Sequence, residues 1–207
     1  MEKVVICGGG KHCSVVLDVL LACGEYEIVG ILDDGKDPIL GIPVIGNDSL
    51  LPELYAQGVR KLFVAIGSNR IRQKVAEYAE GLGYTLINAI SPKASVSSWA
   101  KLGRGILINH GAAVNALACI EDGCIINTNA SVDHHCRIHA YSHVCPGVHI
   151  AGSCDVGMRC FIGTGSNVID GVTIGADTTV GAGAAVVRPL PENCTAVGVP
   201  ARIIRNK

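Results

Sequence analysis

The feature that most constrains the fold is a six-residue periodicity that runs from Val96 to Val186. Every sixth residue over this range is Val, Ile or Leu, sixteen times in succession. A small residue stands two positions before most of these aliphatics, and Ile106 is the clear exception. Such a pattern is typical of a triangular solenoid, in which each hexad forms one face and eighteen residues close one coil. We therefore predict a parallel β-helix of a little over five coils within residues 93–207.

The same pattern predicts where each side chain lies. The large aliphatic points inward and stacks on its equivalent in the next coil, while the small residue leaves room at the corner. The residue after the aliphatic is often Gly, Asn or Asp, as at Gly103, Asn127 and Gly157, and these types tolerate tight turns. The repeat stops before Pro189, and we expect the tail 195–205 to pack back on the solenoid as a cap.

The first part of the chain has a different organisation, in which strand-like and helix-like stretches alternate. A helical pattern follows Gly10, with Val15, Val16, Val19 and Leu20 on one face, and another surrounds residues 71–78. Strands are expected at Val4–Cys7, Glu27–Leu32 and Leu62–Ile66. Strands alternating with helices predict a parallel α/β sheet, so residues 1–92 are expected to form a Rossmann-like domain. Pro92 closes it, because the residue before a proline leaves the helical region.

Charge and cysteine usage exclude several classes of protein. The formal net charge is −1 and no run of Lys or Arg is present, so nucleic acid is not an expected partner. No basic leader and no apolar run of about 20 residues is found, so we expect a cytoplasmic protein without a membrane span. The ten cysteines form no CxxC pair, and four of them occupy small-residue positions of the hexads. We therefore expect neither a disulfide scaffold nor a metal site.

Three segments carry a resemblance to a known family: Gly8–His12, Asn127–His134 and Val197–Arg202. The hexads resemble those of bacterial hexapeptide-repeat acyltransferases. The whole chain looks like the sugar-nucleotide N-acetyltransferase branch that includes PglD and NeuD-like enzymes. The resemblance implies a left-handed β-helix and a homotrimer with acetyl-CoA in the groove between adjacent helices. It implies acetyl transfer to the amine of a nucleotide-linked amino sugar, with a UDP-linked 4-amino-4,6-dideoxy sugar as the expected substrate.

N-acetyl transfer needs a neutral amine, and an imidazole suits the removal of its proton because it titrates near neutral pH. His134 stands two residues after the inward Val132 and matches the general base of the family. The family places a carboxylate immediately after this histidine to orient its ring, whereas this chain has His135 there. Asp133 is then either the residue that orients the ring or an ordinary corner residue, with the backbone holding the ring instead.

The resemblance also indicates residues for acetyl-CoA. His143 matches a residue that contacts the thioester region, and its alternative role is a histidine in the trimer interface. Gly152 lies one coil of eighteen residues after His134, where a missing side chain would let pantetheine pass. Thr164 and Ala182 would line the same groove. Small residues at such places are also ordinary corner residues.

The glycine-rich loop of the first domain is expected to bind the nucleotide sugar. It opens a helix whose free N–H groups could receive a pyrophosphate, although the spacing is not the GxGxxG of NAD-binding proteins. Acidic residues at the end of a strand can bind ribose or base. In the family these positions bind a uridine nucleotide, and the residue matching His12 lies near the sugar; simple turn formation is the alternative. The predicted residues are Gly8, Gly9, Gly10, Lys11, His12, Asp33, Asp34, Ser68 and Asn69.

Three other functions remain open at this point. His134 and His139 are five residues apart, which resembles the spacing of two zinc ligands in γ-type carbonic anhydrases, but Ser98 occupies the place of the third ligand. A non-catalytic assembly protein with a vestigial nucleotide domain is a second alternative. Acetylation of a hydroxyl, as on a sialic acid, or of an amine without a nucleotide is the third.

Overall fold

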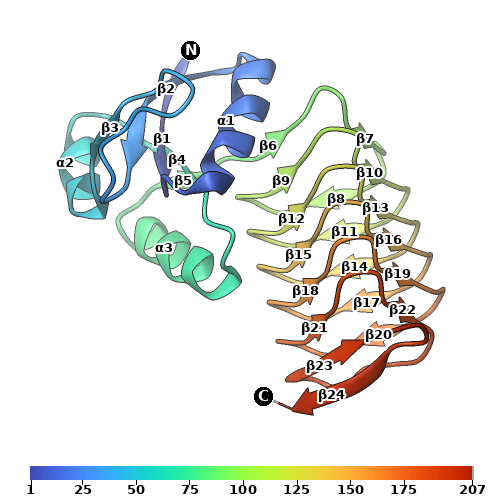
Figure 1. Cartoon of the computed structure of the whole chain (residues 1–207). Coiled ribbons are helices and arrows are strands. Elements are labelled where there is room, and N and C mark those ends of the chain that lie inside the picture. Colours follow the sequence, from blue (N-terminus) through green and yellow to red (C-terminus); the bar gives the residue numbers. More distant parts are fainter. Residues whose placement is uncertain (207) are drawn as a thin grey trace. The chain divides into compact units, whose positions relative to one another are not determined.

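The computed structural model describes residues 1–206. The chain divides into two compact units, Met1–Pro92 and the part from Lys93 onward (Figure 1). Each unit is described by itself below.

The first unit contains a five-stranded sheet in the order β3-β2-β1-β4-β5, with every pair of neighbours parallel. The predicted parallel sheet is thus confirmed. Its strands are β1 (Glu2–Cys7), β2 (Tyr26–Leu32), β3 (Val44–Gly46), β4 (Lys61–Val64) and β5 (Thr85–Leu86). Its helices are α1 (Lys11–Cys23), the 3₁₀ turn η1 (Asp48–Leu50), α2 (Leu51–Ala56) and α3 (Asn69–Gly81). The short strand β6 (Ala89–Ile90) ends the unit.

The buried face of helix α1 matches the predicted face only in part. Its buried residues are Cys13, Val16, Leu17, Val19 and Leu20, whereas Val15 is only half-buried. The helix ends at Gly24, whose left-handed φ of 67° lets its N–H bond back to the carbonyl of Leu20. Because α1 starts directly after β1, its N-terminus lies at the carboxyl edge of the sheet.

The second unit is a parallel β-helix of short strands stacked in three faces (Figure 1). One face consists of β7 (Ser95–Val96), β10 (Ala113–Val114), β13 (Ser131–Val132), β16 (His149–Ile150), β19 (Asn167–Val168) and β22 (Ala185–Val186). The next consists of β8 (Lys101–Leu102), β11 (Cys119–Ile120), β14 (Arg137–Ile138), β17 (Asp155–Val156) and β20 (Thr173–Ile174). The third contains β9 (Leu107–Ile108), β12 (Ile125–Ile126), β15 (His143–Val144), β18 (Phe161–Ile162) and β21 (Thr179–Val180). Val114 pairs with Val132, eighteen residues on, which confirms the predicted coil length.

The core of this unit is the column of inward aliphatics. From Ile108 to Val186 these side chains are at most 3% exposed, and each contributes about 1.5–3 kcal/mol of burial free energy. The cysteines at small-residue positions, Cys124, Cys136, Cys154 and Cys160, are at most 1% exposed, so they pack as small apolar residues as predicted. All ten cysteines are free thiols.

The tight corners lie two positions later than predicted. Left-handed backbone occurs three residues after the inward aliphatic, as at Leu117, His135 and Ser153, with φ of 64°, 58° and 58°. The residue directly after the aliphatic is small for another reason: a Cβ on Gly157 would lie 2.5 Å from the backbone nitrogen of Ala176 in the next coil. Close stacking of coils, and not a turn conformation, therefore selects glycine there.

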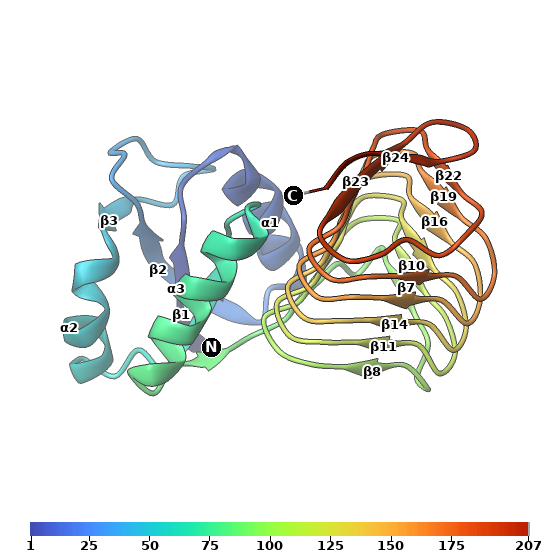
Figure 2. The same ribbon diagram turned by 90° about the horizontal axis from the view of Figure 1, so that it is seen from below.

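The tail caps the solenoid, as predicted. Strand β23 (Cys194–Val197) pairs in parallel with β21, and β24 (Arg202–Asn206) folds back antiparallel on β23. Figure 2 shows this pair closing the end of the stack. No helix of the described residues is long and apolar enough to cross a membrane.

Candidate functional site

The turn between β13 and β14 carries His134 on an exposed and firmly held corner. The Oδ1 atom of Asp133 accepts hydrogen bonds from the N–H of His134 (2.7 Å) and from Nδ2 of Asn115 in the preceding coil (2.8 Å). The His134 carbonyl accepts from the N–H of Ser153 in the following coil at 2.9 Å. The backbone of His134 is thus fixed from both neighbouring coils.

The ring of His134 lies against the ring of His135. The two Nδ1 atoms lie 3.1 Å apart, and the rings meet edge to face with centroids 5.3 Å apart. Asp133 bonds to the backbone of His134 and to Asn115, and these two hydrogen bonds lower the pKa of its carboxyl. Asp133 therefore has the contacts of a corner residue, and the partner of the ring is the neighbouring imidazole rather than Asp133 or the backbone.

Gly152 lies under the ring of His134. A Cβ at Gly152 would come 2.5 Å from Cε1 and 2.7 Å from Nε2 of that ring. The missing side chain therefore makes room for the histidine, which is a different reason for glycine from the passage of pantetheine that the sequence suggested. Contact of Gly152 with acetyl-CoA stays a prediction.

His143 is the first residue of β15 and is 8% exposed. Its Nε2 lies 3.1 Å from Nδ2 of Asn127, and the ring of Phe161 meets it edge to face at 5.3 Å. Oδ1 of Asn127 accepts the backbone N–H of Thr128, which identifies the other amide atom as the donor toward His143. Nε2 of His143 therefore accepts, and the neutral ring carries its proton on Nδ1.

Within one chain, the predicted general base and the predicted acetyl-CoA-binding residues fall into two groups. His134 and Gly152 lie at the corner between the β13 and β14 faces. His143 lies on the β15 face, and the exposed Thr164 and Ala182 lie at the corner that follows β18 and β21. A complete strand face lies between His134 and His143, roughly 15–20 Å for six residues at about 3.3 Å each. A single thioester cannot touch both groups of one chain.

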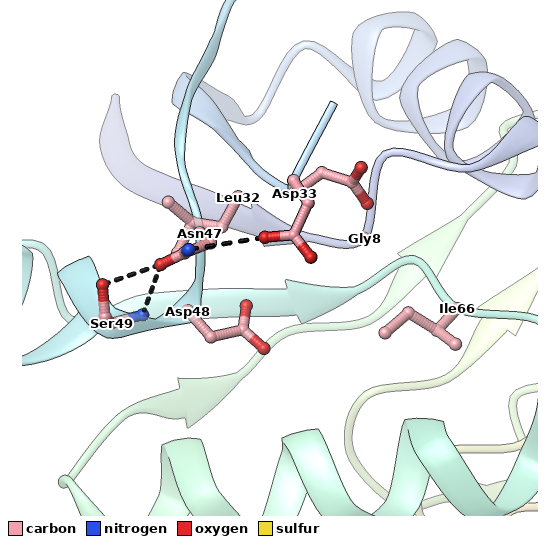
Figure 3. Close-up of a pocket in the computed structure, with 8 residues that line it drawn as sticks. Gly8, Leu32, Asp33, Asn47, Asp48, Ser49 and Ile66 are labelled. Atoms are coloured by element: carbon pink, nitrogen blue, oxygen red, sulfur yellow. Dashed lines mark hydrogen bonds between the residues drawn. The ribbon is translucent and has the colours of Figure 1, made fainter. Parts of the chain in front are cut away.

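The first unit has a pocket of about 320 Å³ at the carboxyl ends of its strands (Figure 3). It brings together three of the predicted residues, Gly8, Asp33 and Asp34. Asn47, Asp48 and Ser49 also line it, and the sequence reasoning missed them. Their signal was a polar triplet that follows a short strand and precedes Leu-Leu-Pro, a pattern typical of a helix start. Leu32 and Ile66 complete the lining.

Asp33 holds the glycine loop in place. Its Oδ2 accepts the N–H of Gly9 at 2.7 Å and its Oδ1 accepts the N–H of Gly35 at 2.9 Å. These backbone hydrogen bonds lower the pKa of the Asp33 carboxyl. The N–H of Gly8 donates to the Leu32 carbonyl at 2.8 Å, so two of the three loop N–H groups bind within the protein. The N–H groups of Gly10 and Lys11, at the start of α1, are the candidates for a phosphate.

Three carboxylates give the pocket a strongly acidic character. Burial, and then the negative charges of Asp34 and Asp33, raise the pKa of Asp48. Nδ2 of Asn47 lies 3.4 Å from Oδ1 of Asp34 (Figure 3). Oδ1 of Asn47 accepts a hydrogen bond from the hydroxyl of Ser49 at 2.7 Å. Beside the loop, burial and the charge of Arg72 lower the pKa of His12 to about 4, so this ring is neutral at pH 7.

Ser68 and Asn69 do not line the pocket. Ser68 is the exposed residue before α3, and Oδ1 of Asn69 accepts from Nη2 of Arg72 at 2.9 Å. Arg72, which is 2% exposed, also donates to the carbonyls of Ile66 and Gly67. This buried arginine shapes the loop after β4, and no pattern in the sequence indicated it.

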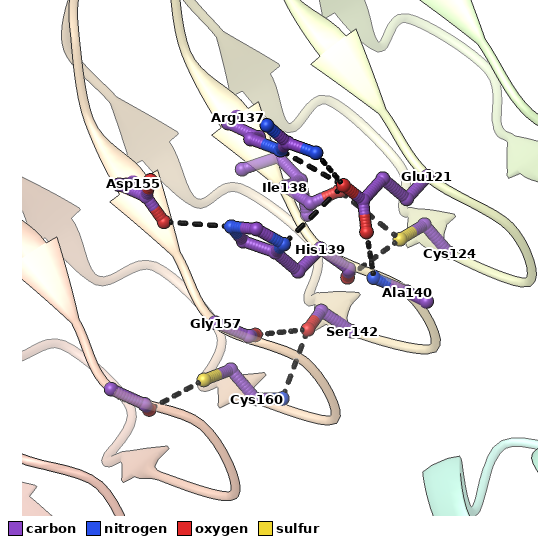
Figure 4. A network of polar contacts seen from close by, with 11 residues as sticks. Glu121, Cys124, Arg137, Ile138, His139, Ala140, Ser142, Asp155, Gly157 and Cys160 are labelled. Atoms are coloured by element: carbon purple, nitrogen blue, oxygen red, sulfur yellow. Dashed lines mark hydrogen bonds and ion pairs between the residues drawn. The ribbon is translucent and has the colours of Figure 1, made fainter.

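Figure 4 shows the surroundings of His139, which lies between two carboxylates. Its Nδ1 is 3.3 Å from Oε1 of Glu121 and its Nε2 is 3.0 Å from Oδ1 of Asp155. Among residues 1–206, no group of three or more His, Cys, Asp or Glu side chains is arranged to hold a metal ion. Both ring nitrogens of His139 thus lie close to carboxylate oxygens on the surface of the coils.

Comparison with known proteins extends the resemblance. Residues 3–79 match the PglD N-terminal domain family. PerB from Caulobacter crescentus, solved with CoA and GDP-perosamine, superposes with a TM-score of 0.95 at 51% identity over 99% of this chain and 98% of that chain. The acetyltransferase domain of PglB from Neisseria gonorrhoeae, solved with acetyl coenzyme A, superposes with a TM-score of 0.94 at 38% identity over 98% and 99% of the two chains.

A curated relative, the UDP-N-acetylbacillosamine N-acetyltransferase of Bacillus subtilis, is 36% identical over 118 residues, or 52% of this chain and 51% of its own length. The chain spans between 40% and 51% of the length of the first curated relatives it matches. The solved relatives, in contrast, are matched over nearly their whole length. The chain therefore belongs to the PglD-like family of sugar-nucleotide N-acetyltransferases, built from an N-terminal α/β domain and a left-handed hexapeptide-repeat β-helix.

Proposed function

We propose that this protein transfers the acetyl group of acetyl-CoA to the amine of a GDP-linked amino sugar. The observation that carries the proposal is the ring of His134, exposed on a fixed corner of the β-helix and oriented by a second imidazole. A relative that is 51% identical over nearly the whole chain was solved with CoA and GDP-perosamine, which supports this choice of co-substrates.

The reaction requires an unprotonated Nε2 on His134. The amine nitrogen attacks the thioester carbonyl carbon and forms the new C–N bond. Its proton passes to Nε2 of His134, the C–S bond breaks, and the departing CoA thiolate takes up a proton from the imidazolium. A general base of this kind contributes about 10²–10⁴-fold to the rate.

The acidic pocket supports guanine as the base. Carboxylates repel a pyrophosphate, so the pocket suits the nucleoside, whose ribose hydroxyls and base N–H groups are neutral donors. Guanine offers N1–H and N2–H₂ side by side, a pair that matches the two oxygens of a carboxylate such as Asp48. Uracil, which the resemblance suggested, offers a single N–H between two carbonyls. A UDP sugar stays the second candidate because of the curated bacillosamine relative.

The separation of the two residue groups supports a homotrimer. His134 and Gly152 of one subunit would face His143, Thr164 and Ala182 of its neighbour, so the cofactor would lie between the two β-helices. The parallel faces and the uninterrupted stack provide the flat surfaces that such an arrangement needs. We place the enzyme in the cytoplasm, where acetyl-CoA and nucleotide sugars are available.

The test is release of CoA thiol from acetyl-CoA in the presence of GDP-, UDP- and TDP-linked amino sugars, with the product identified by mass spectrometry. We expect turnover with the GDP sugar and a loss of about 10²–10⁴-fold in kcat for His134→Asn. His149→Asn, in the next coil, is the matched control and should keep full activity. Absence of turnover with every amino sugar would refute the proposed function, whereas preference for a UDP sugar would correct the nucleobase only.

A further inference from the structure

We propose that His135 is a positioning residue that fixes the tautomer and the orientation of His134, in place of a carboxylate. The inference rests on the proposed function of His134 as a base. It starts from the 3.1 Å contact between the two Nδ1 atoms, in which one ring must donate and the other must accept.

The contact permits two arrangements of protons. If His134 donates from Nδ1, its Nε2 has a lone pair that can take the proton of the amine, and His135 carries its own proton on Nε2. If His135 donates instead, Nε2 of His134 is already protonated and cannot act as a base. Catalysis therefore requires the first arrangement, in which His135 is a neutral acceptor.

The charges around the pair favour this arrangement during the reaction. Positive charge develops on His134 when it takes a proton, and the ionised Asp133 lies against the backbone of the same residue. The imidazolium keeps its Nδ1–H bond to His135, so the hydrogen bond survives the proton transfer. Asp133 thus attracts the charge, while His135 holds the ring.

The remaining neighbours of the pair are mostly uncharged. The preceding coil presents Asn115, Ala116 and Leu117, and the following coil presents Gly152 and Ser153, which leaves Asp133 as the charged group beside the rings. Further titratable groups are the buried thiols of Cys136 and Cys154 behind the corner and Asp170, which follows Gly152 by one coil.

The corner itself explains how His135 reaches this place. Its backbone is left-handed, with φ of 58°, and its N–H bonds to the Ala116 carbonyl at 3.2 Å. Asn and Asp tolerate this conformation and place an oxygen near the position of Nδ1, while Gly adopts it without a side chain. Substitution of His135 by Asn, Asp or Gly therefore separates the effect of the hydrogen-bond geometry at this position from the effect of its charge.

The consequence of a neutral partner appears in the pH–rate profile. A carboxylate at position 135 would stabilise the imidazolium by its charge, so His134 would lose its proton at higher pH. We expect His135→Asp to stay active but to move the acidic limb of the kcat profile to higher pH by about one unit. His135→Asn supplies a neutral acceptor, so it should keep the wild-type limb and a kcat within a few-fold of wild type. His135→Gly should lower kcat by about 10–10²-fold with little change in either KM.

A second measurement determines the tautomers of His134 and His135 without an activity assay. Histidine ring ¹⁵N shifts of the intact protein, assigned with His134→Asn and His135→Asn, should show the neutral His134 protonated on Nδ1 and His135 on Nε2. In His135→Gly, His134 should become a mixture of tautomers. An Nε2-protonated His134 in the wild type, or a loss of kcat in His135→Asn as large as in His134→Asn, would overturn the proposal. Absence of acetyl transfer by the wild type would instead refute the function, and the ¹⁵N result would still decide the pairing.

Discussion

Gly152 lies directly against the ring of His134, one coil away, with no space for a methyl group between them: a Cβ there would come 2.5 Å from Cε1. The position of the His134 side chain is therefore limited by the backbone of its turn, by the contact with His135 and by the close approach of Gly152. The inward aliphatic side chains fix the backbone of the coils. A side chain added at Gly152 would therefore displace the His134 ring and not the backbone.

We expect Gly152→Ala to lower kcat by about 10²-fold, since a displacement of roughly 1 Å in a reacting group has that effect. The KM for acetyl-CoA should change little, and the protein should stay folded by circular dichroism. The matched control is Gly81→Ala in α3, where an added Cβ meets nothing within 4 Å. If Gly152→Ala instead raised the KM for acetyl-CoA at constant kcat, the glycine would serve the passage of pantetheine, as the sequence alone suggested.

The β-helix could be predicted almost residue by residue, because each hexad places one side chain inward and the pattern repeats without a gap. His134 could be placed for the same reason, since its position relative to Val132 fixes its corner. The partner of its ring could not be predicted. It depends on the left-handed backbone of His135, and the sequence had indicated tight turns at a different position.

The nucleotide pocket was predicted only in part for a related reason. Strand ends indicated Asp33 and Asp34, but Asn47–Ser49 come from a short strand and a 3₁₀ turn that carry little periodicity. Asp33 also has a structural role that the sequence did not indicate, because its carboxylate accepts the N–H of Gly9. A hydrogen bond between residues 24 positions apart has no signature in the sequence.

The lowered pKa of Asp33 predicts a pH-dependent stability. The carboxylate is ionised in the folded chain at a pH where the unfolded chain, with a carboxyl pKa near about 3.9, starts to take up protons. Its contribution is therefore complete at neutral pH and disappears as the pH falls through the folded pKa. Asp33→Asn should lower Tm at pH 7, and this difference from wild type should shrink at pH 3. Thermal denaturation at both pH values tests this, with the exposed Asp37→Asn as control. An equal Tm difference at both values would contradict it.

Ser142 supports a stability prediction in the β-helix. It is fully buried, donates to the Gly157 carbonyl at 2.7 Å and accepts the N–H of Cys160 at 2.9 Å (Figure 4). Ser142→Ala removes both hydrogen bonds and should cost about 1–3 kcal/mol of unfolding free energy. Ser142→Cys should cost less, because the cysteines at equivalent positions, such as Cys160, donate to the next coil in the same way. Urea denaturation measures both, and equal losses would contradict the role of the hydrogen bonds.

The last prediction concerns the site shared between subunits. If His134 of one subunit acts with His143 of its neighbour, His134→Asn and His143→Ala each remove a different half of every site. Each variant alone should be nearly inactive. Trimers formed by refolding an equal mixture should regain activity, because a site is intact when one neighbour supplies each wild-type residue. Random mixing gives about a quarter of the sites in this state, so about a quarter of wild-type kcat is expected.

The control is a mixture of His134→Asn with the double variant His134→Asn/His143→Ala, which contains no intact site in any arrangement and should stay inactive. Mixing the two single variants without refolding tests whether subunits must exchange. Recovery of activity only in the refolded mixture supports a composite site. If the refolded single variants form mixed trimers, as native mass spectrometry would show, and yet regain no activity, then His134 and His143 do not act across subunits. Because the β14 face separates the two residues within one chain, His143 would then have no part in the thioester chemistry.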